Sequence, residues 1–383
     1  MAQDSLGVGS DNRREVRSLT GLRGVSALLV VLVHTVAAGA PVGFAEVFVW
    51  HGYLWVDMFL LLSGFILLRT YESLFHEKPF VAAYPDFLVR RLARIWPLFA
   101  LVTVATLVAR QTGLTWFPQP IQPWAWTLAA NLMMIQAWVG QASIDLPGWS
   151  VSGEWACCLM FPLFLRLLDR RHGGSALGVY LAGFAVLVAL TCSPIPHRRG
   201  GLDLAFPETP FPVLRCIASF AMGMALWRGS AHPRLLAIVG LRFADVGLVG
   251  LIIVLMGFPH TDLAVVALFG LLIICLSRQS GIVDRILGNG PAYWAGLISY
   301  SIYLLQVPLI VLKQQTWLIL DEQRLLAVIG VETNKASWLA LFYVLLLGCS
   351  MATWWMVEQP FRKMLRLVAD RLLGELLAVR ADT

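Results

Sequence analysis

The sequence predicts an all-α, polytopic membrane protein, a helical bundle of about ten transmembrane helices. Its 383 residues are 58% hydrophobic and only 14% charged, and the mean hydropathy is +0.73. A soluble domain carries about a quarter charged residues and is far less apolar. The 15 tryptophans fit the same class, because Trp is enriched at the two membrane–water interfaces.

Ten apolar runs are long enough, or nearly long enough, to cross a bilayer. They lie at 22–40, 53–69, 95–110, 153–168, 176–193, 213–228, 240–258, 262–277, 294–312 and 337–357. A further segment, 124–139, is predicted to be re-entrant or interfacial, because the loops on its two sides contain no Lys or Arg. Loops without basic residues are typical of the external side, so both flanks of this segment face outward.

Basic residues predict the orientation of the chain. They precede the first span, at Arg13, Arg14 and Arg17, and follow the second span, at Arg69, Lys78, Arg90, Arg91 and Arg94. Cytoplasmic loops carry the excess of Lys and Arg. We therefore expect a cytoplasmic tail at 1–21, a membrane domain at 22–358 and a basic cytoplasmic tail at 359–383, all in the cytoplasmic (inner) membrane. Arg198 and Arg199 are exceptions, because they fall in a predicted external loop.

The cysteines and the net charge argue against a disulfide-rich protein, a metal-binding protein and a nucleic-acid-binding protein. All six cysteines lie in or beside apolar runs, where Cys is usually a small hydrophobe, and none has zinc-ligand spacing. We expect neither a disulfide framework nor a metal site. The net charge of +6 comes mostly from short loops beside the spans, so we expect membrane lipid, and no nucleic acid, as a partner.

The first span holds two polar residues that hydrocarbon does not tolerate easily, Arg23 and His34. They are separated by about three helical turns, so they project from nearly the same face, ~16 Å apart along the axis. Alanines share that face and allow a neighbouring helix to approach closely. We expect this face to point into the bundle.

Asp57, in the second span, is expected to lie at the same membrane depth as His34, because the two spans form an antiparallel hairpin. A carboxylate beside an imidazole fixes its tautomer and stabilises the imidazolium, as in a catalytic base with its orienting partner. The alternative is a polar pair that only packs two helices together.

Three further motifs carry polar residues. Arg91 and Arg94 are either positive-inside anchors or binders of a phosphate-bearing donor, since clustered guanidinium groups bind phosphates well. Glu154 either falls in the first turn of a helix capped by Ser150 or, with Trp149, borders a carbohydrate-contacting rim. The apolar span at 294–312 carries Tyr300, Tyr303 and Gln306, which need hydrogen-bond partners inside the bundle and are either interhelical contacts or substrate-binding groups.

In order along the chain, six stretches resemble the acyltransferase-3 family of bacterial integral-membrane acyltransferases. They are LTGLRGVSALLVVLVH, GYLWVDMFLLLSGF, FLVRRLARIWP, WSVSGEW, ISYSIYLLQVPL and EQPFRK, and together they cover about positions 17–363. Each stretch is short, but six in the right order on a ten-helix plan make a specific signal.

The resemblance implies roles for individual residues. His34 corresponds to the essential histidine of the first helix, Arg23 to the arginine of the same motif, and Arg91 and Arg94 to the RxxR pair. Asp57, Ser63 and Gly64 belong to the second-helix motif, and Glu154 is the acidic residue after the WS signature. One position departs from the family, because Gln306 stands where a histidine is usual.

The family most often moves acetyl groups from cytosolic acetyl-CoA to hydroxyls of surface glycans, lipid-linked sugars or secreted metabolites. The resemblance thus implies an O-acetyltransferase whose donor co-substrate is acetyl-CoA or another acyl-CoA. We expect His34, Asp57 and Glu154 to be catalytic, Arg23, Arg91 and Arg94 to bind the donor, and Trp149, Tyr300, Tyr303 and Gln306 to bind the acceptor. His34 acts either as general base or as transient acyl carrier. The rival hypotheses are a transporter and a non-catalytic partner in glycan export.

Overall fold

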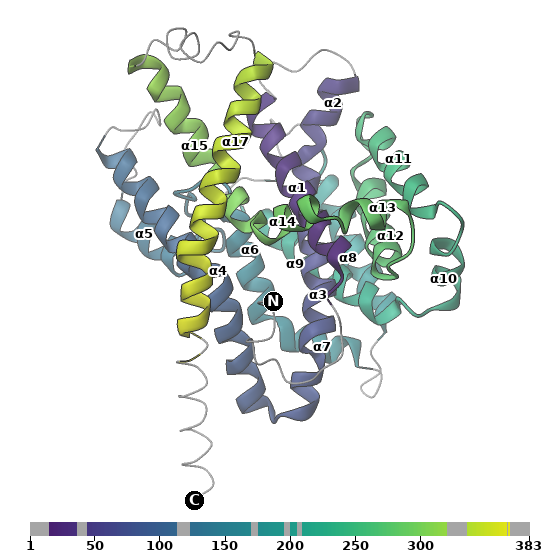
Figure 1. The fold of residues 1–383 in the computed structure, drawn as a ribbon. Coiled ribbons are helices and arrows are strands. Elements are labelled where there is room, and N and C mark those ends of the chain that lie inside the picture. The colour runs from purple at the N-terminus through teal and green to yellow at the C-terminus, as the bar shows by residue number, and fades with distance from the viewer. Residues whose placement is uncertain are drawn as a thin grey trace, which may run out of the picture.

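The computed structural model describes residues 15–36, 44–112, 123–169, 175–194, 200–204, 209–319, 335–365 and 367. These residues form helices joined by short turns and loops, with no strand among them (Figure 1). The first half contains α1 (Arg17–Val36), α2 (Phe44–Trp50), α3 (Trp55–Glu77), α4 (Phe80–Gln111), α5 (Trp124–Leu132), α6 (Gly148–Leu159), α7 (Phe161–Leu168) and α8 (Ala176–Thr191). The second half contains α9 (Phe211–Gly229), α10 (Pro233–Val239), α11 (Ala244–Met256), α12 (Asp262–Ser277), α13 (Ile282–Leu287), α14 (Gly290–Leu297), α15 (Ser299–Ile319) and α17 (Lys335–Thr353).

The all-α membrane fold is confirmed, and each predicted span overlaps a helix or a pair of helices. Among the described residues, four helices are long and apolar enough to cross a membrane alone, at Arg17–Thr35, Ala45–Glu77, Phe80–Gln111 and Trp338–Leu365. Three bent pairs raise the number to as many as seven if each pair is one span. The expected total of about ten crossings stays a prediction.

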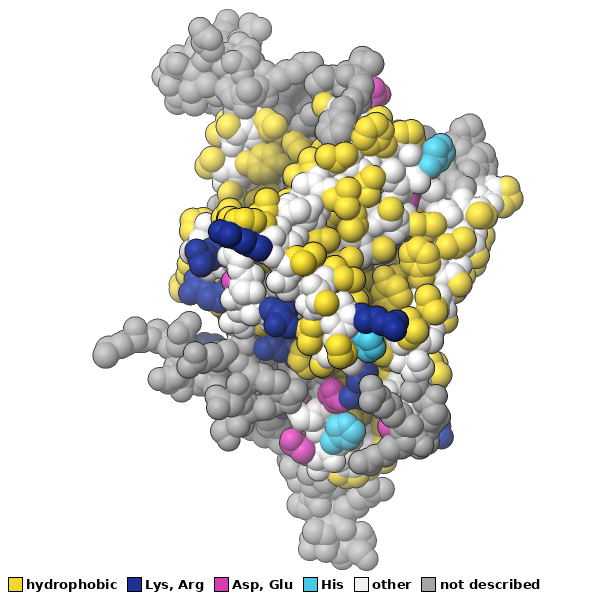
Figure 2. All heavy atoms as spheres, turned by 90° about the vertical axis from the view of Figure 1, so that its right-hand side faces the viewer, with side chains coloured by type: hydrophobic (Ala, Val, Ile, Leu, Met, Phe, Trp, Pro, Cys, Tyr) yellow, Lys and Arg dark blue, Asp and Glu magenta, His cyan; other side chains and the backbone are white. Residues whose placement is uncertain are grey.

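The surface fits a bilayer. Figure 2 shows one face on which hydrophobic side chains predominate, with Lys and Arg side chains at its left edge and toward its lower part. The exposure of so many large apolar residues would be unfavourable in water, but it is favourable in contact with lipid.

The segment predicted to be re-entrant, 124–139, forms only a short helix. α5 ends at Leu132, and Met134 adopts a positive φ of 57°, which turns the chain back. Nine helical residues span about 14 Å, roughly half of the hydrocarbon core. The helix is therefore too short to cross. Asn131 ties the returning chain to α5, because its amide donates to the carbonyl of Ala142 and its Oδ1 accepts from the Ile144 N–H.

The third predicted span began at residue 95, but α4 begins at Phe80. Polar and basic residues at 84–94 lower the mean hydropathy there, so the apolar run does not include this part of the helix. Asp86 neutralises part of the added segment, since it pairs with Lys78 at 2.9 Å and with Arg90 at 2.5 Å. As a consequence, the arginines that follow lie in the middle of a long helix and not in a loop.

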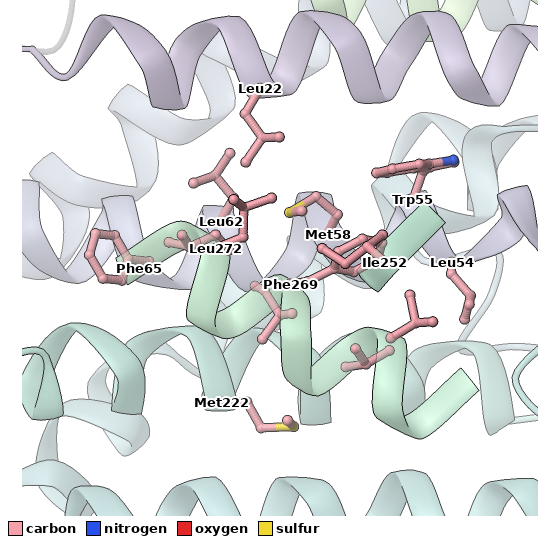
Figure 3. Packing of buried hydrophobic residues seen from close by; sticks show 14 of the residues in the cluster. Leu22, Leu54, Trp55, Met58, Leu62, Phe65, Met222, Ile252, Phe269 and Leu272 are labelled. Atoms are coloured by element: carbon pink, nitrogen blue, oxygen red, sulfur yellow. The ribbon is translucent and has the colours of Figure 1, made fainter. Parts of the chain in front are cut away.

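The core of the bundle is the contact between α3 and α9, with α1, α11 and α12 packed around it. Figure 3 shows side chains from these helices interleaving: Leu22 from α1, Met58 and Phe65 from α3, Met222 from α9, Ile252 from α11, and Phe269 and Leu272 from α12. Glycines bring the two central helices close together. A Cβ at Gly64 would lie 2.1 Å from the carbonyl oxygen of Phe220, and one at Gly223 would lie 2.0 Å from that of Leu61.

Replacing Gly223 by Ala should therefore push α3 and α9 apart. We expect Gly223→Ala to lower the free energy of unfolding by about 1–3 kcal/mol, as overpacking of a close-packed core does. The change is measured as a lower midpoint of thermal unfolding in detergent. Gly250→Ala on α11 is the matched control, because nothing lies within 4 Å of the Cβ it adds. Equal midpoints for the two variants would contradict the close approach.

Candidate active site

A polar cavity of about 70 Å³ lies between α1, α3, α6 and α15. Its polar lining comes from Arg23, Ser63, Ser150, Glu154, Ser299, Tyr300 and Tyr303, and apolar side chains such as Phe59 and Val151 close the rest. A water molecule needs about 10–15 Å³ by this measure, so the cavity has room for a few waters or a slender ligand. We call it the central cavity. It brings together four residues that the sequence singled out, Arg23, Glu154, Tyr300 and Tyr303.

A break between α14 and α15 exposes polar groups to this cavity. The two helices meet at Ile298 with a bend of 68°, and Ser299 and Tyr300 directly after the bend line the cavity. Helix breaks within a membrane are tolerated where they line a cavity or are buried in protein. The Tyr300 hydroxyl donates to the carbonyl of Ile95 at 2.6 Å, which holds α15 against α4.

Glu154 is held by Arg91. Its Oε1 accepts from the Arg91 guanidinium at 2.6 Å and from the Ser63 hydroxyl at 3.0 Å. The prediction that Ser150 caps the helix is wrong, because α6 begins at Gly148. The Ser150 hydroxyl instead donates to the carbonyl of Pro147 at 3.0 Å and contacts the Tyr303 hydroxyl at 2.7 Å. Glu154 thus lies beyond the first turn, and an ion pair accounts for its position better than the helix dipole.

Arg94 is held by a carboxylate that the sequence reading did not select. Its guanidinium donates to Glu358 Oε2 at 2.6 Å, and Arg362 donates to the same oxygen at 2.6 Å. The Ser301 hydroxyl donates to the other oxygen at 2.5 Å. Glu358 is buried at the end of a π-helical turn, Trp354–Glu358, that follows α17. The signal was present in the EQPFRK stretch, which begins at Glu358 and was placed at the edge of the C-terminal tail.

Arg23 is the cation of the central cavity without a direct partner. Among the residues that the structure describes, it has no hydrogen-bond or ion-pair partner, although Arg91, Arg94, Glu154 and Glu358 all act on its charge. A buried guanidinium keeps five donors that need acceptors. This one is poised to receive a negatively charged or strongly polar ligand group.

His34 lies in the last turn of α1, with an exposed side chain. Its Nδ1 is 3.1 Å from Gln306 Oε1, and the amide nitrogen of Gln306 donates to the carbonyl of Tyr303 at 2.9 Å. Because that second bond orients the amide with its oxygen toward the imidazole, Nδ1 carries the proton and donates it. Nε2 then carries the lone pair that a base or nucleophile needs.

The predicted pairing of His34 with Asp57 is wrong. Asp57 is bound by Arg215, with 3.1 Å from Nε to Oδ1 and 2.5 Å from a terminal nitrogen to Oδ2, and by the Ser219 hydroxyl at 2.8 Å. The exposed fraction of the side chain is 1% for Arg215 and 0% for Asp57. An antiparallel hairpin constrains only the depth of two residues, and it contains no information on the direction in which their side chains point. Arg215 was visible as an arginine inside the predicted span at 213–228.

Trp149 is buried and does not form an open rim. It is 9% exposed and packs in an apolar cluster with residues of α3, α6 and α9. The guanidinium of Arg215 lies 5.8 Å from the centre of its indole ring, within the range of a cation–π contact.

The fold and the cavity are those of a polytopic membrane protein with charged groups gathered inside its bundle. The family model described as an acyltransferase domain, Acyl_transf_3, matches residues 16–356. The chain is also 32% identical over 240 residues to Acyltransferase MdmB from Streptomyces mycarofaciens. The matched region covers 55% of this chain and 59% of that protein. No solved structure matches the chain. The chain thus spans less than two thirds of the length of that relative, and the match to the family model over most of its own length shows that it belongs to the acyltransferase-3 family.

The ion pair of Asp57 with Arg215 should be structural. We expect Asp57→Asn to leave a buried guanidinium uncompensated and to destabilise the protein by about 3–5 kcal/mol. The effect is measured as a lower midpoint of thermal unfolding and a lower yield of folded protein. Ser219→Ala removes only a neutral donor to the same carboxylate and should cost about 1 kcal/mol. An Asp57→Asn protein with unchanged stability but a lowered kcat would instead show that Asp57 takes part in catalysis.

Proposed function

We propose that the protein is a membrane acyltransferase, which moves an acetyl or other acyl group from cytosolic acyl-CoA to a hydroxyl of an acceptor. The acceptor is a cell-surface glycan, a lipid-linked sugar or an exported metabolite. The protein then lies in the cytoplasmic membrane with both termini on the cytoplasmic side, where the donor is available. The observation that carries the proposal is the central cavity, where an unpaired, half-buried arginine, Arg23, stands on the same helix as His34.

The donor side of the site is the arginine group. Arg91 and Arg94 are each tied to a carboxylate by one short contact, which leaves further guanidinium N–H groups of each residue to bind phosphate. Their side chains are 14% and 18% exposed, so a ligand reaches them without unfolding the bundle. The diphosphate of CoA would bind here, and the thin pantetheine arm would enter the central cavity past Arg23.

The chemical step needs a base near the acceptor hydroxyl. The hydroxyl oxygen attacks the thioester carbonyl carbon, a C–O bond forms, and the C–S bond breaks. Nε2 of His34 takes the hydroxyl proton and returns it to the departing CoA sulfur, so no other reactant is needed. Gln306 holds the imidazole in the required tautomer as a neutral partner. The alternative route, in which Nε2 first accepts the acyl group, uses the same tautomer.

Arg23 would bind the donor rather than the reacting carbonyl. Its unpaired guanidinium can donate to a phosphate or amide oxygen of the CoA arm as this arm passes through the central cavity. Tyr303, joined to Ser150 at 2.7 Å, offers a second polar group at the same cavity wall. Arg23 and His34 are ~16 Å apart along α1, so the extended CoA arm would pass Arg23 and bring its thioester to His34, where the acceptor enters from the other side.

Removing the imidazole should abolish transfer without unfolding the protein. We expect His34→Ala to lower the rate of acyl transfer by about 10²–10⁴-fold, the usual contribution of a general base. Transfer is measured by mass spectrometry of glycans after the purified protein, in membrane vesicles, is given acetyl-CoA. His76→Ala is the matched control, since His76 is an exposed histidine at the end of α3. Near-normal transfer by a well-folded His34→Ala protein would remove His34 from the mechanism.

Arg94 should bind the donor and not only set the topology. We expect Arg94→Ala to weaken CoA binding by about 10–100-fold, as the loss of a charge-assisted hydrogen bond does. Glu358 keeps Arg362 as its partner in this variant, so the fold should survive. Arg94→Lys should restore binding only in part, because Lys keeps the charge but lacks the planar fork. The measurement is a calorimetric titration of CoA.

The control for that titration is the neighbouring arginine. Arg90→Gln removes a positive charge from the same helix, but Arg90 pairs with Asp86 outside the central cavity. CoA affinity should change little in this variant. If Arg90→Gln and Arg94→Ala weaken CoA binding equally, the effect is one of overall charge and the donor site is not where we propose.

A further inference from the structure

A groove of about 770 Å³ lies between α7, α8 and α9 and has no part in the mechanism above. Its walls are apolar, since Leu163 and Leu167 line it on α7, Val186 on α8 and Leu214 on α9. All four side chains are exposed, so the groove opens on the surface of the bundle. Among the described residues, it shares no lining residue with the central cavity. We call it the α7–α9 groove.

Small residues make the groove hollow. Gly183 of α8 packs directly on α9, since a Cβ at this position would lie 2.9 Å from the carbonyl oxygen of Ala218. Gly183 and Ala218 both line the groove, and so do Ala182 and Ala221, whose side chains fill little of the space. An apolar hollow that stays empty loses dispersion contacts on one side. In a bilayer we therefore expect an apolar chain to occupy it.

The groove is about as long as one leaflet of a bilayer is thick. Its lining on the α8 side extends from Ser175 to Val186, which corresponds to ~16 Å of helix. Half of the hydrocarbon core of a bilayer is ~15 Å. A transmembrane helix from a second copy of the chain would be about twice as long and would extend beyond the groove. The length instead fits one acyl chain of a lipid.

An arginine stands at one end of the groove. Arg166 lines the groove from the last turn of α7, and Ser175 lines it just before α8 begins, so both lie at the end where the chain leaves α7 and enters α8. The Ser175 hydroxyl already accepts from the N–H of Gly178 at 3.1 Å. Arg166 is exposed, and among the described residues its guanidinium has no hydrogen-bond or ion-pair partner. It is therefore the charged group that the groove offers to a ligand.

The head group of a lipid decides how tightly it binds here. Lipid tails are all about as apolar as leucine, so any of them can fill the groove. A guanidinium binds a phosphate group by charge-assisted hydrogen bonds. Between 166 and 171 the sequence has three arginines and one aspartate, so this end carries positive charge. Positive charge favours a lipid with a net negative head group over a zwitterionic one, and it disfavours a second copy of the same basic segment.

We propose that the α7–α9 groove binds an anionic phospholipid, with the phosphate on Arg166 and one acyl chain between α7, α8 and α9. The lipid belongs to the leaflet on the Arg166 side, and it is a bound partner of the protein and not the acceptor of the acyl group. It stabilises the position of α7, which follows α6 after a bend of 54°. Because α6 carries Glu154, the lipid supports the helix that positions this carboxylate in the central cavity.

The test measures lipid binding by native mass spectrometry of the full-length protein after delipidation in detergent. Phosphatidylglycerol and phosphatidylethanolamine with identical acyl chains are the two probes. We expect the wild-type protein to bind one phosphatidylglycerol about tenfold more tightly than phosphatidylethanolamine, and Arg166→Gln to abolish this preference, as the loss of a charge-assisted hydrogen bond does. Arg234→Gln is the matched control, because Arg234 is an exposed arginine on α10, outside the groove. This variant should keep the preference.

A second variant tests the part of the groove that would hold the acyl chain. Ala182 is exposed and lines the groove, so Ala182→Leu should fill part of the space without disturbing the core. We expect this variant to weaken binding of both lipids alike, by about threefold or more. Ala185→Leu adds the same side chain to an exposed position of α8 that does not line the groove, and it should bind both lipids as the wild type does.

Two results would overturn the proposal. The first is that the wild-type protein binds the two lipids equally, or that Arg166→Gln keeps the preference, in which case the groove holds bulk lipid without selecting its head group. The second is that the purified protein is a dimer that Ala182→Leu dissociates and Ala185→Leu does not, in which case a second copy of the chain occupies the groove. Neither measurement uses acyl transfer, so a failure of the proposed function would leave this test unaffected.

Discussion

The structure depends on ion pairs between arginines and carboxylates inside the helical bundle. Leaving a buried charge without its partner costs several kcal/mol, so most of the arginines in the interior are bound to a carboxylate. The pairs are Asp57 with Arg215, Glu154 with Arg91, and Glu358 with Arg94 and Arg362. These contacts join helices that are far apart in the sequence, and they leave Arg23 as the cation that faces the central cavity.

The packing of the helices allows this arrangement. Gly64 and Gly223 let α3 and α9 approach until backbone meets backbone, which places Asp57 against Arg215. The bend at Ile298 turns polar groups of α15 toward the cavity, and Ser301 one turn later reaches Glu358. The close helix contacts and the helix break thus have the same effect. They form a polar interior in a chain whose outer surface is apolar.

Much of this could be predicted from the sequence, and the failures have a common cause. Composition and apolar runs predicted the helical membrane bundle, and motif order indicated the family that was then confirmed. The start of α4 was placed too late because hydropathy does not register a helix stabilised by charge pairs such as Asp86 with Arg90. The apolar run predicted that Arg23 and His34 lie on one helix, and helical spacing predicted nearly the same face, but neither contains information on which side chain contacts which across helices. The partners Gln306 and Arg215 therefore came only from the structure.

The central claim is that the arginine-lined cavity holds the acyl donor. It is tested most directly by a cryo-electron microscopy structure of the protein in nanodiscs with bound CoA, with an antibody fragment as a fiducial. We expect the CoA phosphates against Arg91 and Arg94, the pantetheine arm in the central cavity beside Arg23, and the thiol end directed toward His34. CoA bound outside the bundle, with that cavity holding only water, would contradict it.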